Sequence, residues 1–168
     1  MSVVRWFGLV TAAAAAGLFA APMAPAGAAL IMHKDISHEM ALAIAEGAIQ
    51  ACAARGYATS AVVVDRDGET LVAMRGDGAG IHTIENARRK AYTANTFKQL
   101  TKDYAKKLED PNSVVHQQVT LPNVIAIDGG VPIKVGNEVI GGAGVSGSPG
   151  VDTECVMAGV DKVKDQLQ

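Results

Sequence analysis

The sequence lacks a strong excess of charge of either sign. Its 15 lysines and arginines are offset by 17 aspartates and glutamates, which gives a formal net charge of −2. Acidic and basic residues are also mixed along the chain. A nucleic-acid-binding domain needs a basic patch or stripe. The composition therefore gives no electrostatic basis for binding nucleic acid.

The sequence also has little that could cross a membrane. Its longest apolar run, residues 6–21, is shorter than the roughly 20 residues that a spanning helix needs. Arg5 precedes this run and the small residues 26–28 follow it, a pattern typical of a signal peptide. We therefore expect residues 1–28 to be a signal peptide, cleaved at its end or one residue later. A retained membrane anchor is the alternative.

The predicted product, residues 29–168, is long enough for one domain with its own core and too short for two typical domains. We expect this domain to be periplasmic or secreted and to lack a membrane span. Its two cysteines, Cys52 and Cys155, would then meet an oxidising compartment. They can pair as a disulfide, or each can be a small buried apolar residue.

Familiar catalytic signatures are missing as well. The sequence has no glycine-rich phosphate loop ending in G-K-[ST] and no H-E-x-x-H zinc motif. In residues 144–148 (GVSGS) the second glycine comes one position too early for a hydrolase nucleophile elbow. His33 and His38 are a weak candidate for a metal pair. These absences argue against a self-contained catalytic set.

What the sequence does contain is two strong hairpin signals. Asp67-Gly68 and Gly136-Asn137 each separate two runs rich in β-branched residues, as tight hairpin turns do. We expect the second hairpin to form the middle of the sheet. Ser37, Thr101 and Asp152 are expected to cap helices. The expected helices lie around residues 38–55, 83–97, 102–108 and 152–167, and the expected strands around 60–65, 69–75, 124–127, 131–135 and 138–146. Residues 112–120 are expected to form a loop.

This order of elements predicts an α+β domain with a single antiparallel sheet of five strands covered by helices. Within the last strand, Gly141, Gly142 and Gly144 carry no side chains. Glycine normally weakens a strand, so another group is expected to approach the backbone closely there. A packed helix, a neighbouring subunit and a flat ligand are the three alternatives.

The predicted helix over residues 83–97 carries three consecutive cations. Because Arg88, Arg89 and Lys90 are adjacent, they spread around the helix axis, and at least one should meet a carboxylate or an anionic ligand. A solvated face with Lys90 paired to an acid is the simpler interpretation. Just before the helix, His82 is the best placed of the four histidines to ligate a haem iron, with the cations near the propionates.

Several of these residues also carry a family resemblance. Residues 78–83 (GAGIHT), 87–94 (ARRKAYTA), 129–133 (GGVPI), 139–141 (VIG) and 144–147 (GVSG) resemble the GlcG/HbpS family of haem-binding proteins. The C-terminal domain of PduO-type corrinoid adenosyltransferases is similar. The resemblance runs from about Ser37 to the end of the chain. Ile81 stands where a common family variant has proline.

The resemblance implies a profilin-like, five-stranded antiparallel sheet flanked by helices, assembled into a symmetric homo-oligomer. It also implies that some members bind haem, so haem is the expected cofactor. The candidate haem-binding residues are His82, Arg88, Arg89, Lys90 and Tyr92, with His82 as the metal ligand. The leading hypothesis is thus an exported haem-binding protein for haem sensing, storage or handling. The alternatives are a structural or accessory homo-oligomer with no haem role, and a small-molecule enzyme that uses Asp77, His82 and Lys90.

Overall fold

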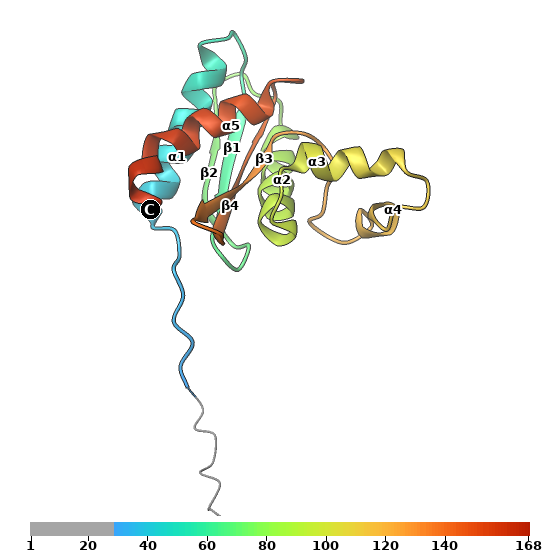
Figure 1. The fold of residues 1–168 in the computed structure, drawn as a ribbon. Helices are drawn as coiled ribbons and strands as arrows, with labels where there is room; N and C mark the ends of the chain where they lie inside the picture. The colour runs from blue at the N-terminus through green and yellow to red at the C-terminus, as the bar shows by residue number, and fades with distance from the viewer. Residues whose placement is uncertain (1–28) are drawn as a thin grey trace, which may run out of the picture. The chain divides into compact units, whose positions relative to one another are not determined.

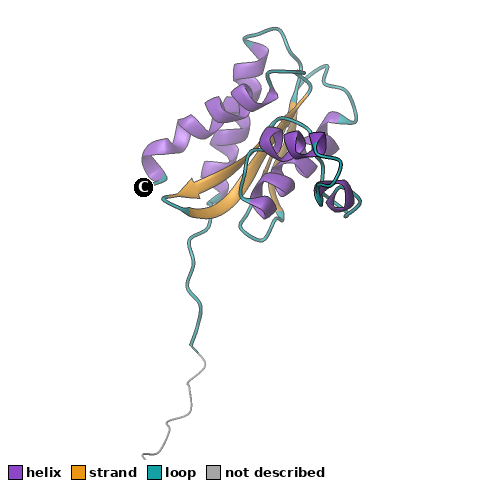
Figure 2. Cartoon of the chain, turned by 45° about the vertical axis from the view of Figure 1, so that its right-hand side comes forward, coloured by secondary structure: helices purple, strands orange, loops and turns teal. Residues whose placement is uncertain are grey.

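The computed structural model describes residues 29–168, of which His33–Gln168 form one compact unit. The predicted signal peptide, residues 1–28, lies outside the described residues, so its cleavage stays a prediction. The unit begins with helix α1, His38–Ala53, which Ser37 caps as predicted, because its hydroxyl accepts a hydrogen bond from the amide of Met40. The α+β class is confirmed: helices cover an antiparallel sheet (Figures 1 and 2).

The sheet has four strands, not the five that were predicted. These are β1 (Ser60–Val64), β2 (Thr70–Arg75), β3 (Gly130–Val135) and β4 (Glu138–Ser146), in the order β2-β1-β4-β3 with all neighbours antiparallel. Both hairpins are confirmed, and Gly68 and Gly136 have the positive φ that their turns require. The second hairpin is not central, however, since β4 is internal while β3 is an edge strand.

The missing fifth strand is the segment 124–127. Its backbone is bonded by side chains of helix α2 (Thr83–Phe97) rather than by a neighbouring strand: Arg89 donates to the carbonyl of Val124, and the hydroxyl of Thr93 accepts from the amide of Ile125 at 2.9 Å. The buried half of this run, Val124 and Ile125, thus stays irregular because side chains satisfy its polar groups.

Helix α2 is the group that approaches Gly142 and Gly144 of β4, whereas a β-carbon at Gly141 would meet the carbonyl oxygen of Val64 on β1. A β-carbon at Gly142 would collide with the carbonyl oxygen of Ala91, and one at Gly144 with that of Ala87. The glycines therefore bring helix backbone and strand backbone into contact on one face of the sheet. Of the three alternatives, the structure shows the packed helix.

The other face of the sheet is covered by α1 and by α5 (Asp152–Val160), which continues as the 3₁₀ helix η2 (Asp161–Gln166). Figure 1 shows these helices side by side on the face opposite α2. A disulfide between Cys52 and Cys155 joins them, with the two Cα atoms 5.4 Å apart. The pairing that the sequence left open is therefore formed.

Smaller helices lie beyond β3. They are α3 (Thr101–Lys106), the 3₁₀ helix η1 (Lys107–Glu109) and α4 (Val115–Gln118). Helix α4 lies inside the segment predicted to be a loop. The predicted cap at Thr101 is wrong: Leu100 is the N-cap residue, and the hydroxyl of Thr101 accepts from the amide of Gly130 at 2.7 Å. Thr101 therefore ties α3 to the start of β3.

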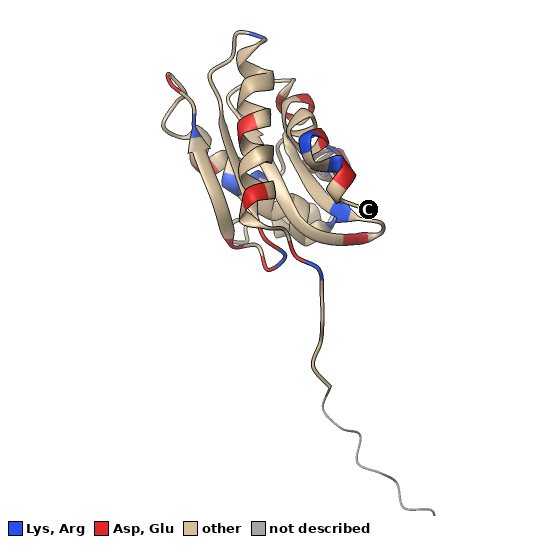
Figure 3. Ribbon diagram, turned by 90° about the vertical axis from the view of Figure 1, so that its left-hand side faces the viewer, with Lys and Arg blue, Asp and Glu red and all other residues tan. Residues whose placement is uncertain are grey.

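The distribution of charged residues agrees with the mixed composition. Figure 3 shows basic and acidic residues scattered over the face that it presents, with no patch of one sign. Within residues 29–168, no helix combines the length and the apolar character that a membrane-crossing segment needs.

Candidate functional site

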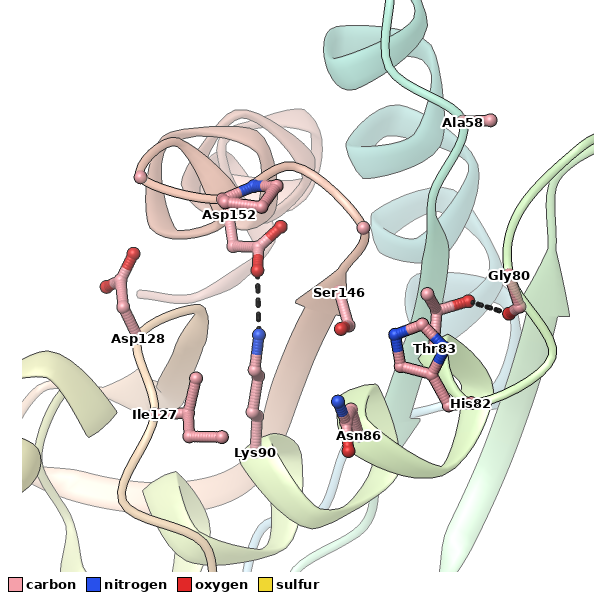
Figure 4. A pocket seen from close by; sticks show the side chains of 13 residues that line it. Ala58, Gly80, His82, Thr83, Asn86, Lys90, Ile127, Asp128, Ser146 and Asp152 are labelled. Carbon is pink, nitrogen blue, oxygen red and sulfur yellow. Dashed lines mark hydrogen bonds and ion pairs between the residues drawn. The ribbon is translucent and has the colours of Figure 1, made fainter.

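The candidate site is a pocket of about 500 Å³, within the range of small-molecule sites (Figure 4). Five segments line it: Ala58 before β1, the turn that ends at His82, the first two turns of α2, residues 127–128 before β3, and the chain from the loop 146–150 to Asp152 at the start of α5. The pocket thus opens where α2, the end of β4 and the start of α5 meet.

His82 lies at the mouth of the pocket, as the N-cap residue of α2. Its side chain makes no cap hydrogen bond and the residue is exposed. Thr83 holds the turn in place, because its hydroxyl donates to the carbonyl of Gly80 at 2.7 Å and lies 2.8 Å from that of Ser60. Figure 4 shows the imidazole directed toward the same space as Asn86.

Lys90 and Asp152 form a buried ion pair deeper in the same pocket. Lys90 is 1% exposed and Asp152 is 5% exposed. The Lys90 Nζ donates to Asp152 Oδ2 at 2.7 Å and to the carbonyl of Val145 at 3.0 Å. An ammonium group has three donors. Among the hydrogen bonds of residues 29–168, the third N–H of Lys90 has no acceptor.

Asp152 is also held from its other side. Its Oδ1 accepts from the amide of Ser148 at 2.8 Å and from the Ser148 hydroxyl at 2.6 Å. The expectation that Asp152 caps the helix is therefore wrong. Val151 is the N-cap residue, and the Asp152 carboxylate points into the protein because two donors and a lysine satisfy it there.

The remaining predicted site residues do not line this pocket. Arg88 donates to Glu85 at 2.8 and 2.9 Å and to Asn123 at 2.7 Å. The Arg88 guanidinium lowers the pKa of Glu85, and the Glu85 carboxylate in turn raises the pKa of Arg88. Arg88 is thus paired on the surface of the helix.

Arg89 and Tyr92 point to the side where segment 124–127 runs. Arg89 is bonded to the Val124 carbonyl, and Tyr92 packs against the cluster of Tyr104, Val115 and Val124. Asp77, which the enzyme alternative requires, does not line the pocket either. Of the predicted set, the structure brings together only His82 and Lys90.

Sequence reasoning missed the other polar groups of the site. Asn86, Asp128, Ser146 and Asp152 all line the pocket, and Asp128 accepts a hydrogen bond from Thr153 at 2.5 Å. One signal was present: His82, Asn86 and Lys90 are spaced by four residues, which places them on one face of a helix. Asp128 and Asp152 come from distant segments and gave no such signal.

Comparison with known proteins fits this architecture. Residues 36–161 match the family model described as "Haem degrading protein HbpS-like". The chain belongs to the HbpS-like family. Its fold matches a crystal structure of a double mutant of HbpS from Streptomyces reticuli with a TM-score of 0.76 and 34% identity, over 86% of this chain and 97% of that one. The family resemblance drawn from the sequence is thereby confirmed.

Three further proteins are similar to this chain in sequence or in fold. Protein GlcG of Escherichia coli K12 is 30% identical over 111 residues, 66% of this chain and 81% of GlcG. An uncharacterized 15.0 kDa protein of Citrobacter freundii is 34% identical over 86 residues, 51% of this chain; the match spans 61% of that protein's length. A crystal structure described as a PduOC:heme complex shares the fold at 21% identity and a TM-score of 0.70, over 76% and 94% of the two chains.

Proposed function

We propose that this protein binds haem in the pocket between α2 and the loop 146–150, with His82 as the iron ligand. The observation that carries the proposal is that one pocket presents an imidazole without a hydrogen-bond partner at its mouth and a buried lysine behind it. A haem site needs an axial ligand, apolar walls and cations for the propionates. The family description and the haem complex of the PduO-type relative support the same ligand.

The apolar surroundings of His82 fit a flat macrocycle. Ile81, next to His82, is 83% exposed, and Ile127, on the wall of the pocket, is 46% exposed. Large apolar side chains gain free energy when a ligand covers them. Haem would supply the iron and its redox chemistry, whereas this chain supplies the ligand, the wall and one free N–H of Lys90 for a carboxylate.

We also propose that the protein is exported to the periplasm or secreted. The leader pattern of residues 1–28 supports this, as does the Cys52–Cys155 disulfide, because disulfides persist mainly in oxidising compartments. A role in haem sensing, storage or handling suits an exported member of this family. A symmetric homo-oligomer is part of the same proposal, and size-exclusion chromatography with light scattering tests it.

The haem proposal is tested by titrating the purified protein with hemin and following the Soret band. We expect a sharpened, shifted band with the wild-type protein and a strongly reduced one with His82→Ala. His116→Ala is the matched control, since His116 lies on α4 and contacts the carbonyl of Asp110, away from the pocket. Identical spectra for all three proteins would refute ligation by His82. A stable oligomer whose spectrum is indifferent to hemin would favour the structural alternative.

A further inference from the structure

Ser148 lies between the pocket and the disulfide. It belongs to the loop 146–150, which forms one wall of the pocket, and its own side chain is 0% exposed. Its hydroxyl donates to Asp152 Oδ1 at 2.6 Å, and the same oxygen lies 2.9 Å from the Sγ of Cys52. One side chain therefore touches both the Cys52–Cys155 bond and the buried ion pair.

The Ser148 hydroxyl can donate only one hydrogen bond. A serine hydroxyl has a single hydrogen to donate, and the sulfur atoms of a disulfide carry none. The carboxylate of Asp152 is the stronger acceptor, so the hydrogen goes to Oδ1 and the serine oxygen meets Cys52 Sγ directly. Cys52 is 0% exposed and Cys155 is 1% exposed, so this contact is buried.

From Asp152 the contacts continue into the pocket. Asp152 Oδ2 accepts from Lys90 Nζ at 2.7 Å, and Lys90 lines the pocket that also holds His82. An unbroken series of contacts thus runs from the disulfide through Ser148 and Asp152 to Lys90.

We propose that Ser148 is a positioning residue that couples the Cys52–Cys155 disulfide to the Lys90–Asp152 pair, so that reduction of the disulfide weakens binding in the pocket. For the part that concerns the ligand, this rests on the proposed function, since the ligand meant is haem with its carboxylates. The effect of Ser148 and the disulfide on the Lys90–Asp152 pair does not depend on any ligand.

Reduction has a defined stoichiometry and a local consequence. A dithiol reductant transfers two electrons and two protons, so the Cys52–Cys155 bond breaks, two thiols form and the reductant becomes a disulfide. Two thiol sulfurs cannot lie as close as two bonded ones, and each now carries a hydrogen. The buried Ser148 has to move, and its hydrogen bond to Asp152 moves with it.

The test uses variants that separate the hydroxyl from the disulfide. Ser148→Ala removes the hydroxyl and leaves both cysteines paired, whereas Cys52→Ala/Cys155→Ala removes the disulfide without creating thiols. The triple variant combines the two changes. Ser37→Ala is the matched control, because it removes a serine hydrogen bond at the opposite end of α1. Circular dichroism establishes that each variant is folded.

The first readout needs no ligand. We expect the Lys90 ammonium protons, observed by ¹⁵N NMR, to exchange with water slowly in the oxidised wild-type protein. Exchange should be roughly fivefold faster in Ser148→Ala and in the disulfide-free variant, because Asp152 then holds Lys90 less firmly. Ser37→Ala should match the wild type. An exchange rate in Ser148→Ala equal to that of the wild type would overturn the coupling.

The second readout is the hemin dissociation constant. We expect it to rise roughly fivefold in Ser148→Ala and in the disulfide-free variant, and to rise no further in the triple variant, because coupled residues act non-additively. If the dissociation constant of the triple variant instead rises by the product of the two separate increases, the two changes act independently and the coupling is refuted, even though each variant binds hemin more weakly. If the oxidised wild type does not bind hemin at all, the proposed function fails, while the Lys90 exchange rates still decide the role of Ser148.

Discussion

At the scale of single residues, the pair of Lys90 and Asp152 dominates the site. A buried charge is tolerated only when its partners replace the lost hydration. Here Asp152 has the lysine and both donors of Ser148, and Lys90 has the carboxylate and the carbonyl of Val145. The pair thereby holds the start of α5 against the middle of α2.

Removing one member of this pair should be costly. We expect Lys90→Met to lower the free energy of unfolding by about 3 kcal/mol, because it leaves the Asp152 carboxylate buried without its counter-charge. Denaturant unfolding followed by circular dichroism measures the change. Lys106→Met, at an exposed lysine on α3, is the control and should change stability by less than about 0.5 kcal/mol. Adding Asp152→Asn to Lys90→Met should recover part of the lost free energy of unfolding, because it removes the unpaired charge. Equal losses of stability for Lys90→Met and Lys106→Met would contradict this account.

The same pair shows how far the sequence could predict the site. The sequence predicted that at least one of Arg88, Arg89 and Lys90 meets a carboxylate or an anionic ligand, with Lys90 paired to an acid as the simpler interpretation, since three adjacent cations on a helix cannot all face water equally. It did not predict Asp152, because the partner is 62 residues away and resembled an ordinary helix cap. His82 and Asn86 shared a visible helical spacing with Lys90. A long-range ion pair has no such local pattern.

At the scale of elements, the contact between α2 and β4 is made by backbone. Ala87 and Ala91 on the helix face Gly144 and Gly142 on the strand. Small residues on both sides let the two elements approach closely, and this closeness places the first turns of α2 beside the end of β4, where the pocket opens.

A single methyl group in this contact should be destabilising. We expect Gly144→Ala to lower stability by about 3 kcal/mol or more, because its β-carbon collides with the carbonyl oxygen of Ala87, and backbone yields less easily than a side chain. Gly136→Ala is the control, because its β-carbon would meet no atom within 4 Å. The positive φ at this position should then lower the free energy of unfolding by only about 1 kcal/mol. Thermal and denaturant unfolding should therefore rank Gly144→Ala as the more harmful change. The reverse order would show that the helix can move away.

The elements themselves were predictable where the signal is local. The two turns at Gly68 and Gly136 and the cap at Ser37 depend on residues that are neighbours in sequence, and all three are confirmed. Segment 124–127 did not form a strand because two α2 side chains, 35 and 32 residues away in sequence, form hydrogen bonds with its backbone. Its own residues are those of a strand.

At the scale of the whole molecule, the disulfide joins α1 and α5, the first and the last α-helices of the described residues. Cys52 and Cys155 are 103 residues apart in sequence, so the bond closes a loop that includes the entire sheet. A cross-link of this length strongly restricts the unfolded chain. The fold is therefore expected to depend on its oxidation state.

This dependence can be measured directly. We expect Cys52→Ala/Cys155→Ala to lower the free energy of unfolding by about 2–5 kcal/mol, the range found when native disulfides are removed. A dithiol reductant should lower the stability of the wild type by a similar amount and leave the double variant unchanged. Equal unfolding curves for the wild type with and without reductant, after thiol titration has shown complete reduction, would contradict the prediction.

The meeting of alanine and glycine backbone between α2 and β4 also limits motion. Because the backbones meet directly at Gly142 and Gly144, the helix has little room to move toward the sheet there, and this contact helps to fix the position of its first turns. A ligand that enters beside them meets a preorganised surface, so little conformational entropy is lost from the helix when it binds. Association is then expected to need no rearrangement of α2, which lines the opening.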